Sequence, residues 1–303
     1  MTAPQDEAVA SRQGAWHQST LDLIGNCSWR YFLTYVLGIP DPSGEAAQTG
    51  TAVHAAVEAH ENARIKGDVP PSLASMQELV TTLLGDGEQA AVARDAVSNW
   101  YKGKPKTGLP HRDWLLEMTP VAVEPYFRVP LVDGAMPIGG WMDAIYRDSN
   151  GIYRIVDLKT AKSMGRWKDS GEGKRHQATV YAIALQVGDL IPEIDYLPEV
   201  TYCVVKTGKG GEVSKRVTVQ PDLEDVRVLG DKIREAQRIV ESEDFVKNPA
   251  WTLCSAQWCP HYQGCMVTGE LSGTPATVRS RVSQNPALGP YNTQATNDTG
   301  GIK

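Results

Sequence analysis

A tight turn between two alternating segments is the feature that most constrains how this chain can fold. Residues 141–147 and 152–158 alternate apolar and polar side chains, and the sequence Asp-Ser-Asn-Gly at residues 148–151 separates them. Such alternation predicts β-strands, and an Asn-Gly pair between strands predicts a hairpin turn. We therefore expect an antiparallel β-hairpin within residues 139–160.

Three charged side chains are expected to meet on one face of this hairpin. If the loop holds three residues centred on Asn150, Asp143 lies opposite Asp157, with Cβ atoms roughly 5 Å apart. Lys159 is two residues beyond Asp157 and therefore points to the same face. A two-residue loop would instead shift the pairing by one residue and place the two acids on opposite faces.

A cluster of two carboxylates and one ammonium group suits a divalent cation. Adjacent carboxylates repel each other, and a hard cation such as Mg²⁺ or Mn²⁺ allows both to stay ionised at neutral pH. The Lys159 ammonium can orient or deprotonate a water molecule, or offset the charge of a phosphate. A surface hairpin with scattered charges is the alternative, and for an isolated D-x-K pattern it is the more frequent one.

The order of these residues resembles the PD-(D/E)XK nuclease core in its RecB-like exonuclease branch, which includes CRISPR-associated and phage members. The matching residues are, in chain order, Gly140, Asp143, Asp157, Lys159, Gln177 and Tyr181. The resemblance implies a restriction-endonuclease-like α/β fold, with a mixed central sheet flanked by helices. It also implies metal-dependent hydrolysis of phosphodiester bonds in DNA, with Asp143, Asp157 and Lys159 as catalytic residues.

A helix upstream of the hairpin adds a candidate metal ligand. It opens at Gly50 and carries His54 and Glu58 one turn apart on the same face. By itself a helical His is more often a packed or exposed residue, but G-x-x-x-H resembles the first motif of the family, whose His completes the metal shell. The resemblance therefore implies that Mg²⁺ or Mn²⁺ is held by His54, Asp143, Asp157 and the backbone carbonyl of Leu158, and Glu58 is a weaker candidate.

The segment between this helix and the hairpin is expected to hold a helical insert and a strand. Helices are predicted at residues 75–84 and 87–101, and we expect them to form an insert over the site. The first strand of the sheet is predicted at residues 121–129. Glu124 within that strand could support the metal shell, although solvation at a strand edge would explain it equally well.

A basic segment after the hairpin is a candidate track for nucleic acid. Trp167 and several glycines are interleaved with its cations, which are Lys162, Arg166, Lys168, Lys174 and Arg175. Such cations bind backbone phosphates, and aromatic rings stack on bases. A helix is expected over residues 175–187, with Gln177 and Tyr181 on one face. In the resembled branch this Q-x-x-x-Y motif adjoins the active site and helps to hold the nucleic acid.

The five cysteines argue against a disulfide framework, because their number is odd and no export signal is evident. Three of them have the spacing C-x4-C-x5-C, which indicates ligation of a soft metal. The resemblance implies an iron-sulfur cluster of the 4Fe-4S type held by Cys27, Cys254, Cys259 and Cys265. Zinc held by these four cysteines, or by three of them with His261, is the alternative, since spacing alone does not fix the metal.

Composition limits the other classes of protein. Thirty Lys and Arg residues against 36 Asp and Glu give a formal charge of −6, so binding to nucleic acid must rest on a local basic patch. No apolar run approaches the roughly 20 residues of a membrane span. The first 15 residues are polar, without a signal-peptide pattern. We therefore expect a cytoplasmic protein that contacts no membrane.

We expect a single nuclease domain over residues 16–268. It would contain the insert, at about residues 70–110, and a cysteine lobe formed by residues 250–266 and Cys27, which staples the two ends of the domain together. The polar residues 1–15 and the Gly-, Ser-, Thr- and Asn-rich residues 269–303 are predicted to be disordered.

These features together favour a metal-dependent DNA exonuclease that acts on single-stranded DNA or DNA ends, in recombination, repair or phage DNA processing. One alternative is an endonuclease or nicking enzyme of the same fold. The other is a cluster-stapled DNA-binding subunit without catalytic activity. Besides DNA, the expected partner is a protein of a recombination, CRISPR or phage system.

Overall fold

The computed structural model describes residues 14–41, 44–106, 108–207 and 212–285. The chain divides into two compact units: the first comprises Met1–Gln18 and Ser43–Asp231, and the second comprises Ser19–Pro42 and Lys232–Lys303. We expected one domain with a small cysteine lobe. The second unit is larger than that lobe, because whole helices from both ends of the chain pack together in it.

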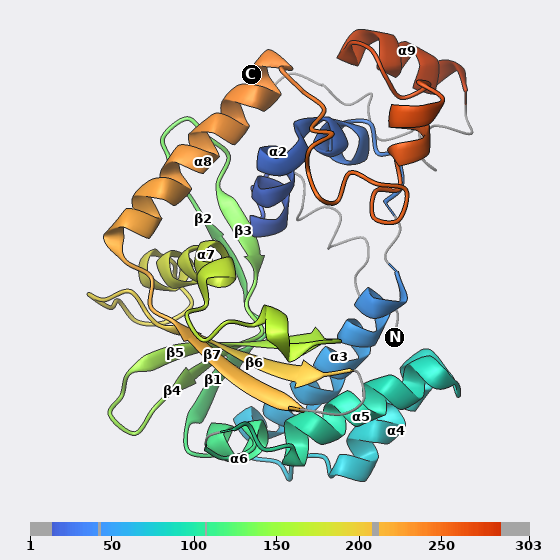
Figure 1. Ribbon diagram of the computed structural model, residues 1–303. Helices are drawn as coiled ribbons and strands as arrows, with labels where there is room; N and C mark the ends of the chain where they lie inside the picture. The colour runs from blue at the N-terminus through green and yellow to red at the C-terminus, as the bar shows by residue number, and fades with distance from the viewer. Residues whose placement is uncertain (1–13, 42–43, 107, 208–211, 286–303) are drawn as a thin grey trace. The chain divides into compact units, whose positions relative to one another are not determined.

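A five-stranded mixed sheet with the strand order β1-β4-β5-β6-β7 forms the centre of the first unit (Figure 1). Strands β5 and β6 are parallel, and the other neighbouring strands are antiparallel. The strands are β1 (Thr119–Val123), β4 (Ala144–Arg147), β5 (Tyr153–Ala161), β6 (Val200–Lys206) and β7 (Ser214–Val219).

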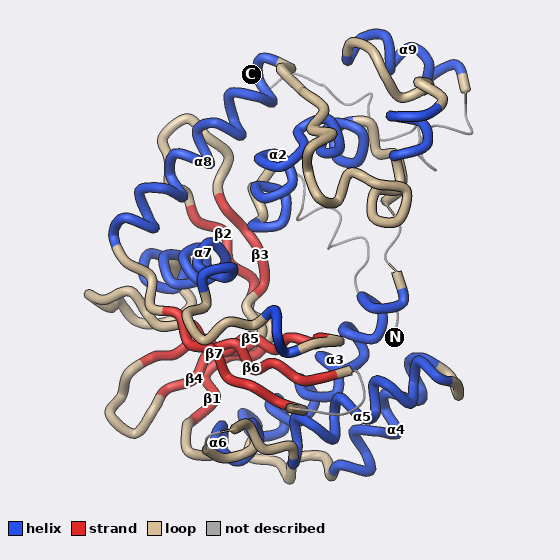
Figure 2. Tube along the Cα trace, viewed as in Figure 1, coloured by secondary structure: helices blue, strands red, loops and turns tan. Residues whose placement is uncertain are grey.

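Helices cover both faces of this sheet (Figure 2). On one face lie α3 (Glu45–Lys66), α4 (Leu73–Leu84), α5 (Glu88–Lys102) and the short α6 (His111–Leu115). On the other face lies α7 (Arg175–Val187), which supplies the crossover that a pair of parallel strands requires. The predicted fold, a mixed central sheet flanked by helices, is confirmed.

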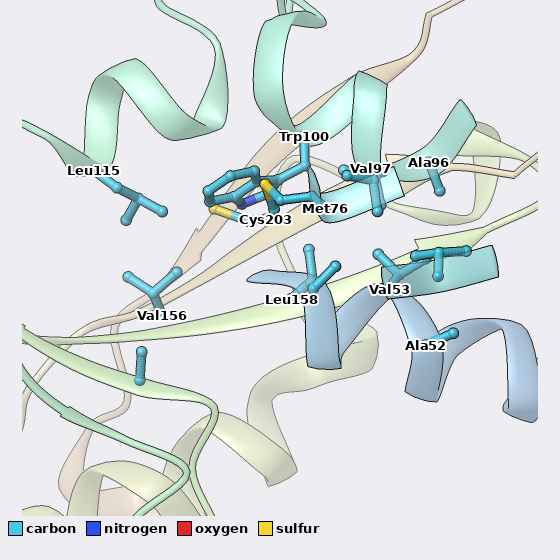
Figure 3. Close-up of a cluster of buried hydrophobic side chains, with 14 of the residues drawn as sticks. Ala52, Val53, Met76, Ala96, Val97, Trp100, Leu115, Val156, Leu158 and Cys203 are labelled. Carbon is cyan, nitrogen blue, oxygen red and sulfur yellow. The ribbon is translucent and has the colours of Figure 1, made fainter. Parts of the chain in front are cut away.

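The core of the first unit lies between the sheet and helices α3 to α5. Val156 and Leu158 of β5 and Cys203 of β6 belong to one buried cluster with Met76 and Trp100 of the helices (Figure 3). The expected insert helices therefore exist, but they form part of the main core. Because side chains alternate along β5, the residues between these core positions project toward the α7 side of the sheet.

Two long strands bend at the edge of the main sheet. Strand β1 is followed by β2 (Tyr126–Val129), and β3 (Ile138–Trp141) is followed by β4. Strands β2 and β3 pair with each other in a separate two-stranded sheet, which stands away from the main sheet in Figure 1. The single strand expected over residues 121–129 is thus wrong, because Glu124 adopts a left-handed backbone conformation with φ of 49° and Pro125 follows it.

The second unit is held together by contacts between its N-terminal and C-terminal segments. Its elements are α2 (Gln18–Tyr31), the π-helix η1 (Phe32–Val36), the C-terminal part of α8 (Leu223–Ser242), the π-helix η4 (Gln263–Val267) and α9 (Pro275–Gln284). The Trp29 indole donates a hydrogen bond to the Leu271 carbonyl at 2.9 Å. The Phe32 and Phe245 rings stack with centroids 5.0 Å apart.

Helix α9 contradicts the prediction that the chain is disordered from residue 269 onward. The Thr274 side chain accepts a hydrogen bond from the Thr277 backbone N–H, and a proline begins the helix. Val278 and Val282 are buried and hold the helix in place. The remaining residues predicted to be disordered, 1–13 and 286–303, lie outside the described residues.

Within the described ranges, no helix combines the length and the apolar character that crossing a membrane requires.

A buried histidine makes the stability of the first unit sensitive to acid. The His111 side chain is fully buried, and its Nε2 lies 3.2 Å from the Val204 carbonyl oxygen. Burial lowers the pKa of His111 to about 4, against the opposing effect of this hydrogen bond and with a small further decrease from Arg216. A histidine in the unfolded chain has a pKa near 6.5.

We expect the free energy of unfolding to fall by about 2 kcal/mol between pH 7 and pH 5 through His111 alone. In that range the His111 side chain of the unfolded chain binds a proton, whereas that of the folded chain does not. The free energy of unfolding is therefore highest above pH 6.5 and falls as the pH decreases toward 4. The variant His111→Gln keeps a hydrogen-bond donor for the Val204 carbonyl but cannot bind a proton. Between pH 7 and pH 5 its free energy of unfolding, measured by urea titration, should fall by about 2 kcal/mol less than that of the wild type. Equal losses would contradict this prediction.

Candidate active site

The β4–β5 hairpin has the register that brings its two acids together. Ala144 pairs with Val156, and the Asp148 backbone N–H donates to the Ile152 carbonyl at 3.0 Å. The loop between them has three residues and ends at Gly151, whose φ of 83° suits glycine. Of the two loop lengths that the sequence allowed, the structure has the three-residue loop, and continuing its register places Asp143 opposite Asp157.

Asp143 and Glu124 lie side by side where the two long strands bend. The Glu124 backbone N–H donates to the Asp143 carbonyl at 3.0 Å, and the Met142 N–H donates to the Pro125 carbonyl at 3.2 Å. Left-handed backbone at a residue other than glycine costs free energy and is common at functional sites. The bend therefore places a second carboxylate beside Asp143.

Helix α3 adds a histidine to these two acids. One ligand atom each from His54, Glu124 and Asp143 lies within 4.8 Å of the others. His54 Nδ1 is 3.4 Å from Asp143 Oδ2, which also accepts a hydrogen bond from the Leu158 backbone N–H at 2.7 Å. These three residues and Glu58 line a cavity of about 30 Å³, enough for one ion or water molecule.

Gly50 of the G-x-x-x-H pattern lies where α3 passes the end of β5. A Cβ atom at Gly50 would lie 3.4 Å from the Thr160 hydroxyl, an ordinary van der Waals contact. The pattern therefore places the helix beside the strand that carries Asp157, with His54 one turn later.

The buried Asp157 carboxylate and the partly exposed Lys159 ammonium form an ion pair beside this group. Lys159 Nζ lies 2.6 Å from Asp157 Oδ2. Apart from this contact, the fully buried Asp157 carboxylate accepts no hydrogen bond of ordinary geometry from the described residues. Burial lowers the pKa of Lys159, but the carboxylates of Asp157 and Asp143 outweigh it and raise the pKa above its usual value. Lys159 is therefore an ammonium donor rather than a base in this state.

Each ionised carboxylate of the site disfavours ionisation of the others. Burial, and then repulsion by Asp143, Glu58 and Asp157, raises the pKa of Glu124 to about 8. Burial and Asp157 also raise the pKa of Asp143, against the opposing charges of His54 and Lys159. A hard divalent cation would offset this repulsion and supply the missing partner of Asp157. The donor set of imidazole and carboxylates thus fits Mg²⁺ or Mn²⁺.

The affinity for Mn²⁺ is expected to rise by nearly tenfold per pH unit up to about pH 8 and then to level off. A metal ion must displace the proton that Glu124 carries below pH 8, so binding releases a proton. Isothermal titration calorimetry at pH 6.5, 7.5 and 8.5 measures this. Glu124→Gln, which cannot ionise, should bind more weakly and show a much flatter pH profile; an unchanged profile would exclude Glu124 as a ligand.

Helix α7 brings the predicted Q-x-x-x-Y motif to the α7 side of the site. Gln177 Nε2 donates to the Tyr181 hydroxyl at 3.1 Å, and the Tyr181 ring is buried. Burial, followed by the charges of Asp157 and Asp143, raises the pKa of Tyr181 well above its usual value. The motif therefore lies within electrostatic reach of both acids.

The basic segment after β5 contributes an open groove of about 520 Å³. Arg166, Lys168 and Lys174 line it, and the Lys174 ammonium lies over the Trp167 ring, 5.0 Å from its centroid. Lys162, also predicted to bind DNA, is exposed nearby in sequence but does not line the groove.

Arg175 differs from the other predicted DNA-binding cations. Its guanidinium pairs with Asp225 and, at 3.1 Å, with Asp222 near the start of α8. These ion pairs direct Arg175 toward α8, so its charge is largely offset within the protein. Pattern alone could not show this, because the acids are distant in sequence.

The four cysteines predicted to bind a cluster all belong to the second unit. Cys27 lies at a kink in α2, and Cys254, Cys259 and Cys265 lie near η4. Burial raises the pKa of Cys265, and the positive charge of Lys247 lowers it. All four are partly exposed free thiols.

Cys203 and His261 are the remaining cysteine and the alternative zinc ligand. Cys203 is buried in the core of the first unit, as expected for a small apolar residue. His261 is also buried, in the second unit, and its Nε2 lies 2.9 Å from the Thr34 hydroxyl.

Most of this chain resembles known proteins in sequence pattern or in fold. Residues 15–266 match the model of the PD-(D/E)XK nuclease superfamily. The crystal structure of a candidate exonuclease from Eubacterium rectale has 10% sequence identity, covers 88% of this chain and 94% of its own, and has a TM-score of 0.54. At this identity the likeness concerns the fold alone.

A second solved structure, SSO0001, has 12% identity, covers 80% of this chain and 94% of its own, and has a TM-score of 0.32, too low to carry an argument. No curated protein matches the sequence.

Proposed function

Because the chain belongs to the PD-(D/E)XK nuclease superfamily, we propose that it is a metal-dependent DNA exonuclease that acts on single-stranded DNA or DNA ends. Membership implies a phosphodiester hydrolase. The observation that carries the proposal is the grouping of His54, Glu124 and Asp143, whose ligand atoms lie within 4.8 Å of one another. Asp157 lies outside this group and forms an ion pair with Lys159 on the neighbouring strand β5.

The ligands that we propose for Mg²⁺ or Mn²⁺ are His54, Asp143, Asp157 and the Leu158 carbonyl, with Glu124 added. When bound, such an ion activates water and stabilises charge on the departing oxygen of a phosphodiester. The Leu158 N–H holds the Asp143 carboxylate in place by the 2.7 Å hydrogen bond. His54 approaches the same carboxylate from α3.

Lys159 has the role of positioning and charge compensation in this proposal. As an ammonium group 2.6 Å from Asp157, it can donate a hydrogen bond to the attacking water or to a phosphate oxygen. Its raised pKa keeps that charge in place before the metal binds. The Gln177–Tyr181 pair lies on the α7 side of the acids and would support the nucleic acid there.

We assign the path of the DNA backbone to the groove lined by Arg166, Lys168 and Lys174, with Lys162 at its approach. These cations come directly after the strand that carries Asp157 and Lys159. Arg175 contributes less, because Asp222 and Asp225 already neutralise it. Binding through phosphates predicts a strong dependence on salt concentration.

We further propose that Cys27, Cys254, Cys259 and Cys265 hold a 4Fe-4S cluster with a structural role, and zinc is the alternative. The C-x4-C-x5-C spacing of three of these cysteines, and the place of all four in the second unit, support a soft metal at this position. By the resemblance to the RecB-like branch, the activity would serve recombination, repair or phage DNA processing, beside a partner protein of such a system.

The test is digestion of end-labelled single-stranded DNA by anaerobically purified protein with Mn²⁺ or Mg²⁺. An exonuclease should degrade a linear strand and leave a circular strand of the same sequence intact. Cutting of both would assign the endonuclease alternative. Absence of cleavage on linear, circular, single-stranded and duplex DNA with both ions would overturn the proposed function.

A further inference from the structure

An aromatic cluster lies beside the bend that carries Glu124 and Asp143. Tyr126 and Trp141 are direct partners across β2 and β3, with ring centroids 4.7 Å apart and planes tilted by 53°. The His17 ring is nearly parallel to that of Trp141, at 13° and 6.4 Å. All three side chains are partly exposed. We call these three residues the Trp141 stack.

One cross-strand pair, Pro125 with Met142, lies between the Trp141 stack and the acids Glu124 and Asp143. The backbone hydrogen bonds across the bend fix this register. Even fully extended chain spans only about 7 Å over two residues, and the bend shortens that distance. Because successive stacked nucleotides are about 3.4 Å apart, a base one or two nucleotides from a phosphate at the acids can reach the rings.

Core packing accounts for the other face of β2 but not for the Trp141 stack. Phe127, the neighbour of Tyr126, is buried and packs edge-on against Tyr181 of α7, with centroids 6.1 Å apart. Because side chains alternate along a strand, Tyr126 points away from α7. The aromatic rings on that face remain partly exposed next to a catalytic centre.

We propose that the Trp141 stack binds a nucleobase of single-stranded DNA next to the scissile phosphate. This inference rests on the nuclease function proposed above and adds the contact that selects an unpaired strand. Every base has a π face, so stacking on Trp141 and Tyr126 holds the strand without sequence preference. A paired base in a duplex cannot enter the stack without being unpaired, which favours single-stranded substrate.

A chemical double-mutant cycle tests this contact. A set of labelled oligonucleotides carries one abasic nucleotide each at successive positions, and fluorescence anisotropy measures their binding in Ca²⁺, with a gel to verify that they stay intact. In the wild type, one abasic position should weaken binding about tenfold. With Trp141→Ala the intact strand should bind about tenfold more weakly, and the same abasic position should cost less than twofold.

The matched control is Trp114→Ala. Trp114 is a partly exposed tryptophan of the same unit, packed under the Arg216 guanidinium 4.9 Å from its ring centroid. It should keep the full abasic effect. If Trp141→Ala does not fold by circular dichroism, Trp141→Leu keeps apolar volume without an aromatic face and replaces it.

If the abasic nucleotide weakens binding by the same factor in the wild type and in Trp141→Ala, the two effects are additive and the Trp141 stack does not bind that base. This result would contradict the stacking proposal and would leave the nuclease proposal intact. Failure of the wild type to bind or cut any DNA would overturn both proposals. The two failures are therefore distinguishable.

Discussion

Asp157→Asn is expected to lower phosphodiester cleavage by this protein by about 10³-fold or more. The asparagine side chain has nearly the same shape, but it offers a neutral amide where the fully buried carboxylate lies beside Lys159. The site loses both a charged ligand for the divalent cation and the partner that orients the ammonium group. Initial rates on end-labelled single-stranded DNA with Mn²⁺ measure the effect.

The control must separate lost chemistry from lost folding. Asp157→Asn removes the carboxylate that pairs with the partly exposed Lys159 ammonium, so some decrease in Tm is expected. The double variant Asp157→Asn with Lys159→Met removes the unpaired charge and should recover Tm without recovering activity. Asp189→Asn, at an exposed position just after α7, should change neither the Tm nor the cleavage rate. Cleavage within tenfold of the wild type by folded Asp157→Asn would exclude Asp157 from the catalytic site.

The sequence was sufficient to predict the hairpin but left its register open between two loop lengths. The alternation on both sides of Asn150-Gly151 allowed a loop of two or three residues, and only the three-residue loop brings Asp143 opposite Asp157, as the pairing of Ala144 with Val156 requires. Helix α7 also begins and ends where predicted, because Gly188 follows an uninterrupted helical pattern. These features depend on neighbours within a few residues.

Features that depend on distant residues were missed or left open. Glu124 lies in a segment that reads as one strand, and its place beside Asp143 follows from a bend held by hydrogen bonds to Met142 and Asp143. The signal was the Glu-Pro dipeptide, which disfavours a continuous central strand. Arg175 likewise reads as a free cation until Asp222 and Asp225 are brought to it by the fold.

The composition of the C-terminal segment led to a wrong prediction of disorder. Gly, Ser, Thr and Pro residues indicated disorder from residue 269, yet some of the same residues cap α9. Two valines one turn apart, Val278 and Val282, provide enough apolar surface to bury the helix. A short capped helix with two buried positions leaves too weak a periodic pattern to outweigh composition.

Cys259→Ser is expected to lower the Tm of the second unit by about 10 °C or more and to release its metal. Metal binding that requires the folded state contributes directly to folding free energy, and several kcal/mol correspond to a shift of this size in a chain of this length. Serine is a poor ligand for a soft metal, so this substitution removes one of the four proposed ligands. Thermal unfolding and metal analysis of anaerobic protein measure both effects.

Cys203→Ala is the matched control, because Cys203 is buried in the core of the first unit, outside this set. It should cost about 1 kcal/mol for a small cavity and keep the full metal content. Iron and sulfide lost from Cys259→Ser but retained in Cys203→Ala would assign the cluster, and zinc in their place would assign the alternative. Full metal content and an unchanged Tm in Cys259→Ser would contradict the four-cysteine set. Because the residues of the nuclease site belong to the first unit, cleavage should persist in Cys259→Ser at temperatures below its unfolding transition, and this separates a structural metal from a catalytic one.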